Sequence, residues 1–375
     1  MMPNKYDLIK KSKNIVVKIG TSILTDIIDG YPQITDKHIK PIVEQIVKYS
    51  DARNFTIVSS GAIGFGMSVL NLKAKPKQLA LKQAAAAIGQ NKLMQMYDKL
   101  FAKYNKVVAQ ILLTQTGIMH RQRYLNAVNT LNALFKLKAI PIINENDTVA
   151  VEEIKFGDND KLGAMVATMI NADLLIILSN IDGLFKNLND KNSLIEDVSA
   201  IDDELLKIAG SASKSTTTGG MISKLRAAEI TMSAGIPMII CNGYDDKIID
   251  KVLTLSYRGT FFYPAKKTLA PRKHWIKYNL KPRGKIIIDD GAVKALKNNK
   301  SLLPSGIVNV TGDFDAGDCV GVYNSNNEKI AKGLCNYNKF ELLQIKGLKT
   351  SEIKKKFDFY DADEALHIDN MVLIN

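Results

Sequence analysis

Short runs of aliphatic and β-branched residues alternate with helical patterns along most of the chain. The runs that are apolar at nearly every position cover residues 14–18, 55–59, 107–113, 140–143, 174–178 and 237–240. Such runs are typical of strands that are buried on both faces of a sheet. Between them, apolar residues recur at helical spacing, as at Ile39, Val43, Ile46 and Val47. This alternation predicts an α/β fold with a mainly parallel sheet sandwiched by helices, in which ligands bind beyond the carboxyl ends of the strands.

The pattern changes after Lys285, where short strand candidates follow one another closely. These candidates cover residues 285–289, 306–311, 319–323 and 329–334, with helix candidates at 292–298 and 339–343. They predict a small, mainly β domain. Residues 265–285 are rich in Lys and Arg, contain no Asp or Glu, and are interrupted by prolines, which disfavours a helix. We therefore expect one domain over residues 1–264, a basic linker over 265–280 and a second domain over 281–375.

The composition limits the class of protein. A chain of 375 residues with 46% hydrophobic and 24% charged residues can build two or three domains with large cores. Its apolar runs are far shorter than the roughly 18 residues of a membrane-spanning helix, and charged residues interrupt the N-terminal segment, so we expect a cytoplasmic protein without membrane contact. Its 3 cysteines share no CxxC spacing, which favours reduced thiols. The net charge of +13 is compatible with an anionic partner, and equally with a composition that is rich in lysine throughout.

Two strand ends carry groups that can bind an anion such as a phosphate. Lys18 ends the first strand, and Gly20 after it lets backbone N–H groups approach an anion closely. Ser60 and Gly61 follow the second strand and precede a helix, whose N-terminus attracts anions. Each segment also has a structural interpretation, as a solvated lysine or a tight turn. The glycines near Gly61 do not form GxGxxG, and the sequence contains no P-loop pattern.

The fourth strand ends abruptly in amides and carboxylates at residues 144–147. Polar side chains are costly to bury without partners, so these groups are expected to meet solvent or a ligand, and an ammonium group would suit them. The alternative interpretation is an Asx-type turn.

The segment Gly157-Asp158-Asn159-Asp160 stands directly before a helical pattern. Asp and Asn are common N-caps, yet one helix needs only one cap. Asp158 and Asp160 together can organise lysines or a metal ion near a transferring phosphate.

A last segment, residues 216–224, is rich in hydroxyl groups and glycine and opens an amphipathic helix. Such a loop can cradle a phosphate, and Lys224 in the first helical turn adds a positive charge. The alternative is a flexible linker followed by a capped helix.

Taken in this order, the segments resemble the amino-acid kinase family over essentially the whole chain. The distinctive motifs are VKIGTS at 17–22, SGAI at 60–63, NEND at 144–147, GDND at 157–160, TGGMISK at 218–224 and RKHWI at 272–276. The resemblance implies the amino-acid kinase fold, and the segment from about Lys281 is similar to the PUA domain that many bacterial members carry.

The resemblance also implies roles for particular residues. Lys18 and Lys224 would contact the phosphates of ATP, and Asp158 would orient both lysines. Ser60, Asp147 and Asn159 would hold the substrate. The catalytic set is Lys18, Lys224, Asp158 and Asp160, with the division of roles between the two aspartates open. Nucleotide contacts are expected from Lys18, Gly20, Ser179, Asn180, Thr218, Gly219, Gly220, Met221, Ile222, Ser223 and Lys224.

Within the family, the match is closest to members that phosphorylate glutamate. This implies transfer of the ATP γ-phosphate to the γ-carboxylate of L-glutamate, with Mg²⁺, as the first step of proline biosynthesis. The resemblance further implies a homo-oligomer, a dimer or a tetramer, and a possible glutamyl phosphate reductase partner.

Some positions depart from the family pattern. Ser179-Asn180 stands where Thr-Asp is usual, Thr217 replaces a glycine, and Ser223 replaces a threonine. These changes concern the nucleotide contacts more than the phosphate and carboxylate groups. A function of another class remains open, since PUA domains often bind RNA and the predicted linker is basic; the set of kinase residues ranks this alternative lower.

Overall fold

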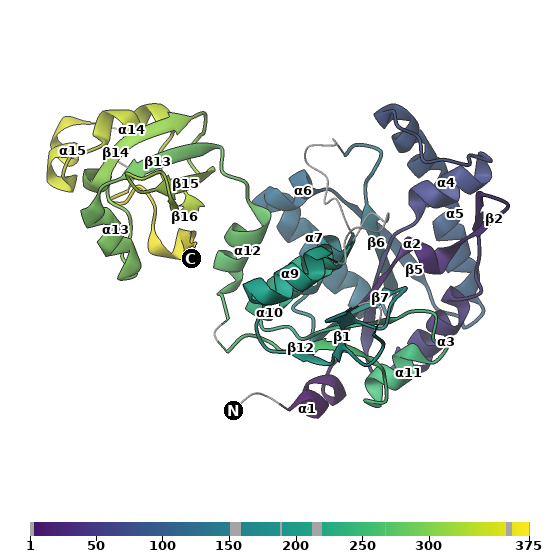
Figure 1. Ribbon diagram of the computed structural model, residues 1–375. Helices are drawn as coiled ribbons and strands as arrows, with labels where there is room; N and C mark the ends of the chain where they lie inside the picture. Colours follow the sequence, from purple (N-terminus) through teal and green to yellow (C-terminus); the bar gives the residue numbers. More distant parts are fainter. Residues whose placement is uncertain are drawn as a thin grey trace. The chain divides into compact units, whose positions relative to one another are not determined.

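The computed structural model describes residues 4–150, 159–187, 190–211, 220–266, 268–357 and 362–374. Contacts between residues divide the chain into two compact units, Met1–Thr268 and Leu269–Asn375. Each unit has its own sheet and its own hydrophobic core (Figure 1).

The first unit is built on an eight-stranded sheet with the strand order β10-β12-β11-β7-β1-β4-β6-β5. Its strands are β1 (Asn14–Ile19), β4 (Asn54–Ser59), β5 (Val108–Leu113), β6 (Ile140–Glu145), β7 (Leu174–Ser179), β10 (Asp197–Val198), β11 (Met238–Asn242) and β12 (Gly259–Phe262). β1 pairs in parallel with β4 on one side and β7 on the other, while β12 runs antiparallel to β11. The mainly parallel sheet is therefore confirmed, and each expected strand lies at its predicted position within a residue or two.

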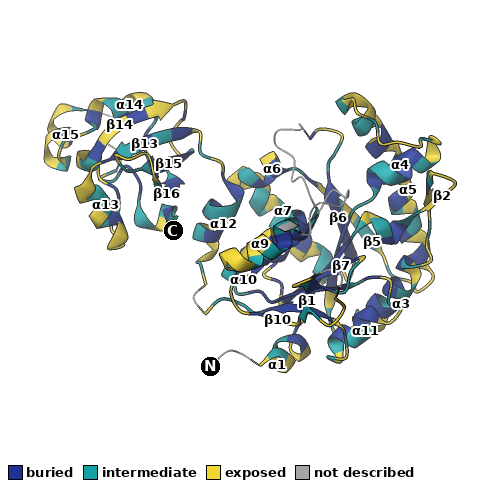
Figure 2. Ribbon diagram, in the orientation of Figure 1, coloured by how far each residue is buried: buried dark blue, intermediate teal, exposed yellow. Residues whose placement is uncertain are grey.

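Helices cover both faces of this sheet. They are α1 (Lys5–Lys10), α2 (Thr21–Leu24), α3 (Ile39–Tyr49), α4 (Ala62–Val69), α5 (Leu79–Ala102), α6 (Gln115–Met119), α7 (Arg121–Lys136), α8 (Asn159–Met169), α9 (Asp203–Ser211), α10 (Met221–Ser233) and α11 (Ile248–Leu253). Buried residues of α3, α5 and α11 share one core with Ile15, Val17 and Ile19 of β1. Gly163 of α8 packs against Lys18, so α8 covers the opposite face. Figure 2 shows the strands buried between helices whose outer sides are exposed.

Short hairpins complete the unit. They pair β2 (Thr25–Ile28) with β3 (Tyr31–Ile34) and β8 (Leu184–Phe185) with β9 (Leu194–Ile195). The β2–β3 hairpin begins directly after α2 and carries exposed Ile27 and Ile28.

The second unit contains a five-stranded sheet in the order β14-β13-β15-β16-β17. Its elements are α12 (Pro271–Asn279), β13 (Gly284–Ile288), α13 (Asp290–Lys297), β14 (Ile307–Gly312), β15 (Cys319–Tyr323), β16 (Lys329–Leu334), α14 (Lys339–Ile345), α15 (Thr350–Lys356) and β17 (Met371–Leu373). All pairings are antiparallel except that of β13 with β15. The expected small, mainly β domain is confirmed.

The predicted basic linker contains helix α12, which the prolines were expected to prevent. Pro271 occupies the first turn of this helix, where a backbone N–H has no helical partner and proline is tolerated. His274, Trp275 and Ile276 are buried, and the helix packs on β16 and β17. The segment is thus an amphipathic helix of the second unit, in which the basic residues occupy the solvated side.

Helices α4 and α5 cross at unusually close range. A Cβ atom added to Gly89 would lie 1.8 Å from the carbonyl oxygen of Ala62, and one added to Gly66 would lie 1.9 Å from that of Ala85. Because both neighbours are backbone atoms, neither can move aside without displacing a helix.

We predict that Gly89→Ala destabilises the protein by about 2 kcal/mol or more, because the added methyl group forces the helices apart. Gly210→Ala is the matched control: its Cβ meets no atom of the described residues within 4 Å, so it should be neutral or stabilising by roughly 0.5–1 kcal/mol. Urea denaturation of both variants measures the difference. Equal midpoints for the two variants would contradict the close crossing.

Candidate functional site

A cavity of about 770 Å³ opens where several parallel strands of the first unit end. Its lining residues lie at or just after the ends of β1, β4, β6, β7 and β11 and at the starts of α8 and α10. They include Lys18, Gly20, Ser60, Asn144, Asp147, Asn159, Ser179, Asn180, Lys224 and Tyr244. The carboxyl ends of parallel strands are the expected ligand-binding edge of such a sheet. Segments far apart in the sequence are thereby brought into one site.

A buried carboxylate lies between two lysines at this site. Lys18 Nζ is 2.7 Å from Asp160 Oδ1, and Lys224 Nζ is 3.0 Å from Asp160 Oδ2. The Asp160 side chain is 0% exposed and each lysine side chain is 8% exposed. The Ser223 hydroxyl also donates to Asp160 Oδ2 at 3.0 Å. The cluster carries a net positive charge and presents ammonium groups to the cavity, so it suits an anion.

The electrostatics of Asp160 follow from this arrangement. Burial by itself raises the pKa of a carboxyl group, but the ammonium groups of Lys18 and Lys224 outweigh burial and hold the pKa of Asp160 well below its usual range. The lowered pKa means that ionised Asp160 stabilises the folded state. This contribution is fully present at pH values above the pKa of an unfolded aspartate, near ~3.9. It is lost only as the pH falls through the lower pKa of Asp160 in the folded state. The ion pairs are therefore intact at neutral pH.

Local structure explains how the three groups meet. Lys18 is on β1, on the face that α8 covers, and Gly163 leaves room for its side chain, since a Cβ there would be 3.4 Å from Lys18 Cβ. Asp160 lies in the first turn of α8, where the helix dipole favours a negative charge. Lys224 lies near the start of α10, which begins after Gly220. In the structure Asp160 makes the ion pairs to both lysines; Asp158, Thr218 and Gly219 lie outside the described residues.

A second cluster, of amides, lies beside the lysines. Asn159 Nδ2 is 2.8 Å from the Ser59 carbonyl oxygen, 3.0 Å from Ser60 Oγ and 3.0 Å from Asn144 Oδ1. Gly61 follows Ser60 with a φ of 101°, a left-handed conformation that favours glycine, and α4 begins immediately after it. Asp147 lines the same cavity from the turn after β6. Ser60, Asp147 and Asn159, the three expected substrate contacts, thus line one cavity.

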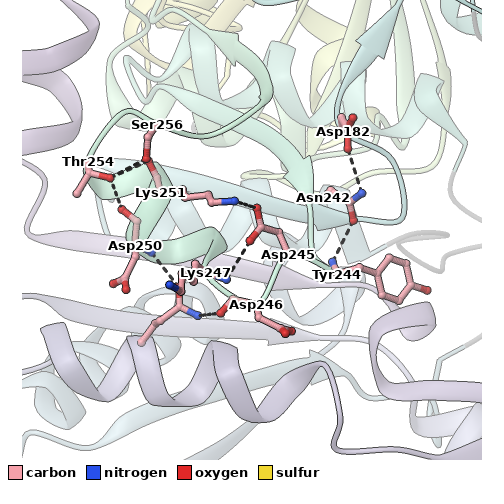
Figure 3. Close-up of polar contacts among 11 residues, drawn as sticks. Asp182, Asn242, Tyr244, Asp245, Asp246, Lys247, Asp250, Lys251, Thr254 and Ser256 are labelled. Carbon is pink, nitrogen blue, oxygen red and sulfur yellow. Dashed lines mark hydrogen bonds and ion pairs between the residues drawn. The ribbon is translucent and has the colours of Figure 1, made fainter. Parts of the chain in front are cut away.

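The loop after β11 contributes Tyr244 to the cavity lining. Figure 3 shows Asn242 donating to Asp182 Oδ1 at 3.0 Å, while its own Oδ1 accepts from the Tyr244 backbone N–H at 3.0 Å. The Tyr244 hydroxyl donates to the Ser22 carbonyl oxygen at 2.9 Å and so ties this loop to α2. Ser179 and Asn180, two of the expected nucleotide contacts, line the cavity next to this loop.

Several lining residues were not predicted from the sequence. They are Asp26 and Ile27 on the β2–β3 hairpin, Lys73 and Lys75 between α4 and α5, and Tyr244. None belongs to a recognisable pattern, because surface hairpins and loops carry no periodic signal.

Neither a helix long and apolar enough to cross a membrane nor a group of at least 3 His, Cys, Asp or Glu side chains that could hold a metal ion occurs among residues 4–374 outside the gaps given above.

A buried lysine pair lies beside an amide cluster at the carboxyl end of a mainly parallel sheet, an arrangement that suits an anionic ligand such as a phosphate. Residues 13–242 match the model of the amino acid kinase family, and residues 284–357 match that of the PUA domain. The chain belongs to the amino acid kinase family and carries a PUA domain.

Curated relatives extend the match to almost the whole chain. A protein named "Glutamate 5-kinase" from a Thermoanaerobacter species is 46% identical over 365 residues, which cover 96% of this chain and 97% of the relative. A protein of the same name from Dictyoglomus turgidum is 46% identical over 371 residues, covering 97% and 98% of the two chains. Among solved structures, carbamate kinase from Giardia lamblia bound to AMP-PNP is similar with a TM-score of 0.49 and 16% identity, over 68% of this chain and 99% of that one.

We predict that Asp160→Asn lowers the free energy of unfolding by about 3–5 kcal/mol, since it removes the buried carboxylate that pairs with both the Lys18 and the Lys224 ammonium group. Asp51→Asn is the matched control, because Lys106 Nζ is also 2.7 Å from Asp51 Oδ1 but the Asp51 side chain is 86% exposed. Exposed ion pairs contribute little, so this variant should unfold like the wild type. Chemical denaturation at pH 7 tests both, and a small, equal loss in the two variants would argue against the buried cluster.

Proposed function

We propose that this protein transfers the γ-phosphate of ATP to the γ-carboxylate of L-glutamate and so forms glutamyl 5-phosphate, the first step of proline biosynthesis. The observation that carries the proposal is that the Lys18–Asp160–Lys224 cluster and the Asn144–Asn159 amides share one cavity. The names of the relatives, which match over nearly the whole chain, support it further.

The chemistry requires positioning and charge neutralisation more than proton transfer. A carboxylate with a solution pKa near ~4.3 is already ionised at neutral pH, so no general base is needed. The barrier comes from bringing an anionic nucleophile to an anionic phosphate. Lys18 and Lys224 would neutralise charge on the phosphates in the transition state, and Asp160 would hold both ammonium groups in place. The division of labour with Asp158 is part of the proposal.

The remaining residues would divide between the two substrates. Ser60, Asp147 and Asn159 would hold glutamate, because an ammonium group needs oxygen acceptors such as a carboxylate and an amide carbonyl. Backbone N–H groups near Gly20 and at the start of α10 would contact the phosphates. The proposed nucleotide contacts are Gly20, Ser179, Asn180, Thr218, Gly219, Gly220, Met221, Ile222 and Ser223.

We take the nucleotide substrate to be MgATP. Mg²⁺ is commonly bound through substrate phosphates, a few carboxylates and water rather than by a cage of protein ligands. The carboxylates among the described lining residues are Asp26 and Asp147. So few carboxylates are consistent with a metal ion that is already bound to the ATP phosphates when the nucleotide enters the cavity.

Two partners belong to the proposal as well. The product is a mixed anhydride that water hydrolyses easily, so a glutamyl phosphate reductase is the class of enzyme that would consume it. Family resemblance supports a homo-oligomer.

RNA binding through the PUA domain is not favoured as the main function, because the match to the kinase relatives extends over both units.

The test is hydroxamate formation from ATP, Mg²⁺, L-glutamate and hydroxylamine, which traps an acyl phosphate. We expect Lys224→Ala to lower the rate at least about 100-fold, because it removes a charge that stabilises the transition state. Lys48→Ala is the control, since Lys48 pairs with Asp250 on the surface, away from the cavity residues. A wild-type chain that forms hydroxamate only with other carboxylates, or none at all, would refute the proposal.

A further inference from the structure

Gln90 of α5 is connected to the amide cluster although its side chain does not line the cavity. Its Oε1 accepts a hydrogen bond of 2.8 Å from Asn144 Nδ2, and both side chains are buried. Gln90 Nε2 is itself buried and has no hydrogen-bond partner in the described parts of the chain. An unsatisfied buried donor is costly, so the orientation of this amide needs an explanation.

Backbone groups at the other end of the network supply that explanation. Asn144 Oδ1 accepts from the Glu145 backbone N–H at 2.8 Å, which can only donate. The Nδ2 group of Asn144 must therefore face Gln90, and Gln90 must accept the hydrogen bond with its Oε1 atom. A flipped Gln90 would place two N–H donors against each other. The unsatisfied Nε2 group is thus the consequence of supplying an acceptor to Asn144.

The same reasoning determines the orientation of the Asn159 side-chain amide. Its Nδ2 group is 2.8 Å from the Ser59 carbonyl oxygen, which can only accept, and 3.0 Å from Asn144 Oδ1. The amide nitrogen is thus engaged by the protein, and no donor among the described residues pairs with Oδ1, which can accept from a ligand in the cavity that Asn159 lines. Gln90 holds Asn144, and Asn144 in turn holds Asn159 with its carbonyl oxygen available.

We propose that Gln90 is a positioning residue for substrate recognition, acting through Asn144 to keep Asn159 Oδ1 oriented toward the α-ammonium group of the amino-acid substrate. The inference rests on the proposed function, since it assumes that an amino acid occupies this side of the cavity. It predicts that Gln90 acts by accepting a hydrogen bond from Asn144. A side chain of similar volume that cannot accept this bond should not replace it.

Substitutions that separate these two roles test the inference. Gln90→Met fills a similar volume but cannot accept the hydrogen bond, so it should raise the KM for glutamate by about tenfold, with the KM for MgATP and the thermal midpoint little changed. Gln90→Glu keeps an oxygen toward Asn144 in either protonation state, and its ionised form also lacks the unsatisfied donor. Its KM for glutamate should stay within about threefold of the wild type.

Gln95→Met is the matched control, because Gln95 lies on the same helix but its amide donates to exposed Asn91. All kinetic constants should be those of the wild type. The assay is hydroxamate formation with each substrate varied in turn.

The outcomes are distinct. An unchanged KM for glutamate in Gln90→Met, or an equal loss in the Met and Glu variants, overturns the positioning role while the proposed function stands. If Gln90→Met does not fold, Gln90→Glu decides: a tenfold rise in its KM for glutamate overturns the inference. A wild-type chain that forms no glutamyl hydroxamate refutes the proposed function, and the inference with it.

Discussion

The site depends on one buried carboxylate that holds two lysines. The Asp160 side chain is fully buried, and the ammonium groups of Lys18 and Lys224 keep it ionised despite burial. Asp160 in turn stabilises the charge of both buried lysines. The three residues come from β1, α8 and α10. Strand and helix packing therefore sets the distance between the ammonium groups, and the charge cluster ties those elements together where phosphate is expected.

The amide side of the cavity is held by hydrogen bonds between neutral groups instead of ion pairs. There, neutral groups are aligned by backbone N–H and carbonyl groups whose donor or acceptor character cannot change. The network reaches from the cavity to Gln90 on α5, and the same helix packs closely on α4 through Gly66 and Gly89. Since α4 starts just after Ser60, the glycine crossing and the amide network both position the substrate side. The two halves of the cavity thus rely on charge and on oriented dipoles, respectively.

Much of this could be predicted from the sequence, for physical reasons. Strands buried on both faces are continuous apolar runs, and polar residues at their ends mark the ligand-binding edge, so Lys18, Ser60 and Asp147 stood out. Gln90 did not, because its partner is 54 residues away and only the fold brings them together. Tyr244 and Lys73 line the cavity from loops that carry no periodic pattern. Helix α12 was missed because Pro271 was taken as a helix breaker, whereas proline is compatible with the first turn.

The most direct test of the account is a crystal structure of the full-length protein with L-glutamate and a non-hydrolysable ATP analogue. We predict that phosphate oxygens lie within hydrogen-bond distance of Lys18 Nζ and Lys224 Nζ, with both lysines still paired to Asp160. The glutamate ammonium group should contact Asn159 Oδ1, and its γ-carboxylate should face the terminal phosphate. A nucleotide bound away from the lysine pair, or a glutamate carboxylate in place of the phosphates between the lysines, would contradict the account.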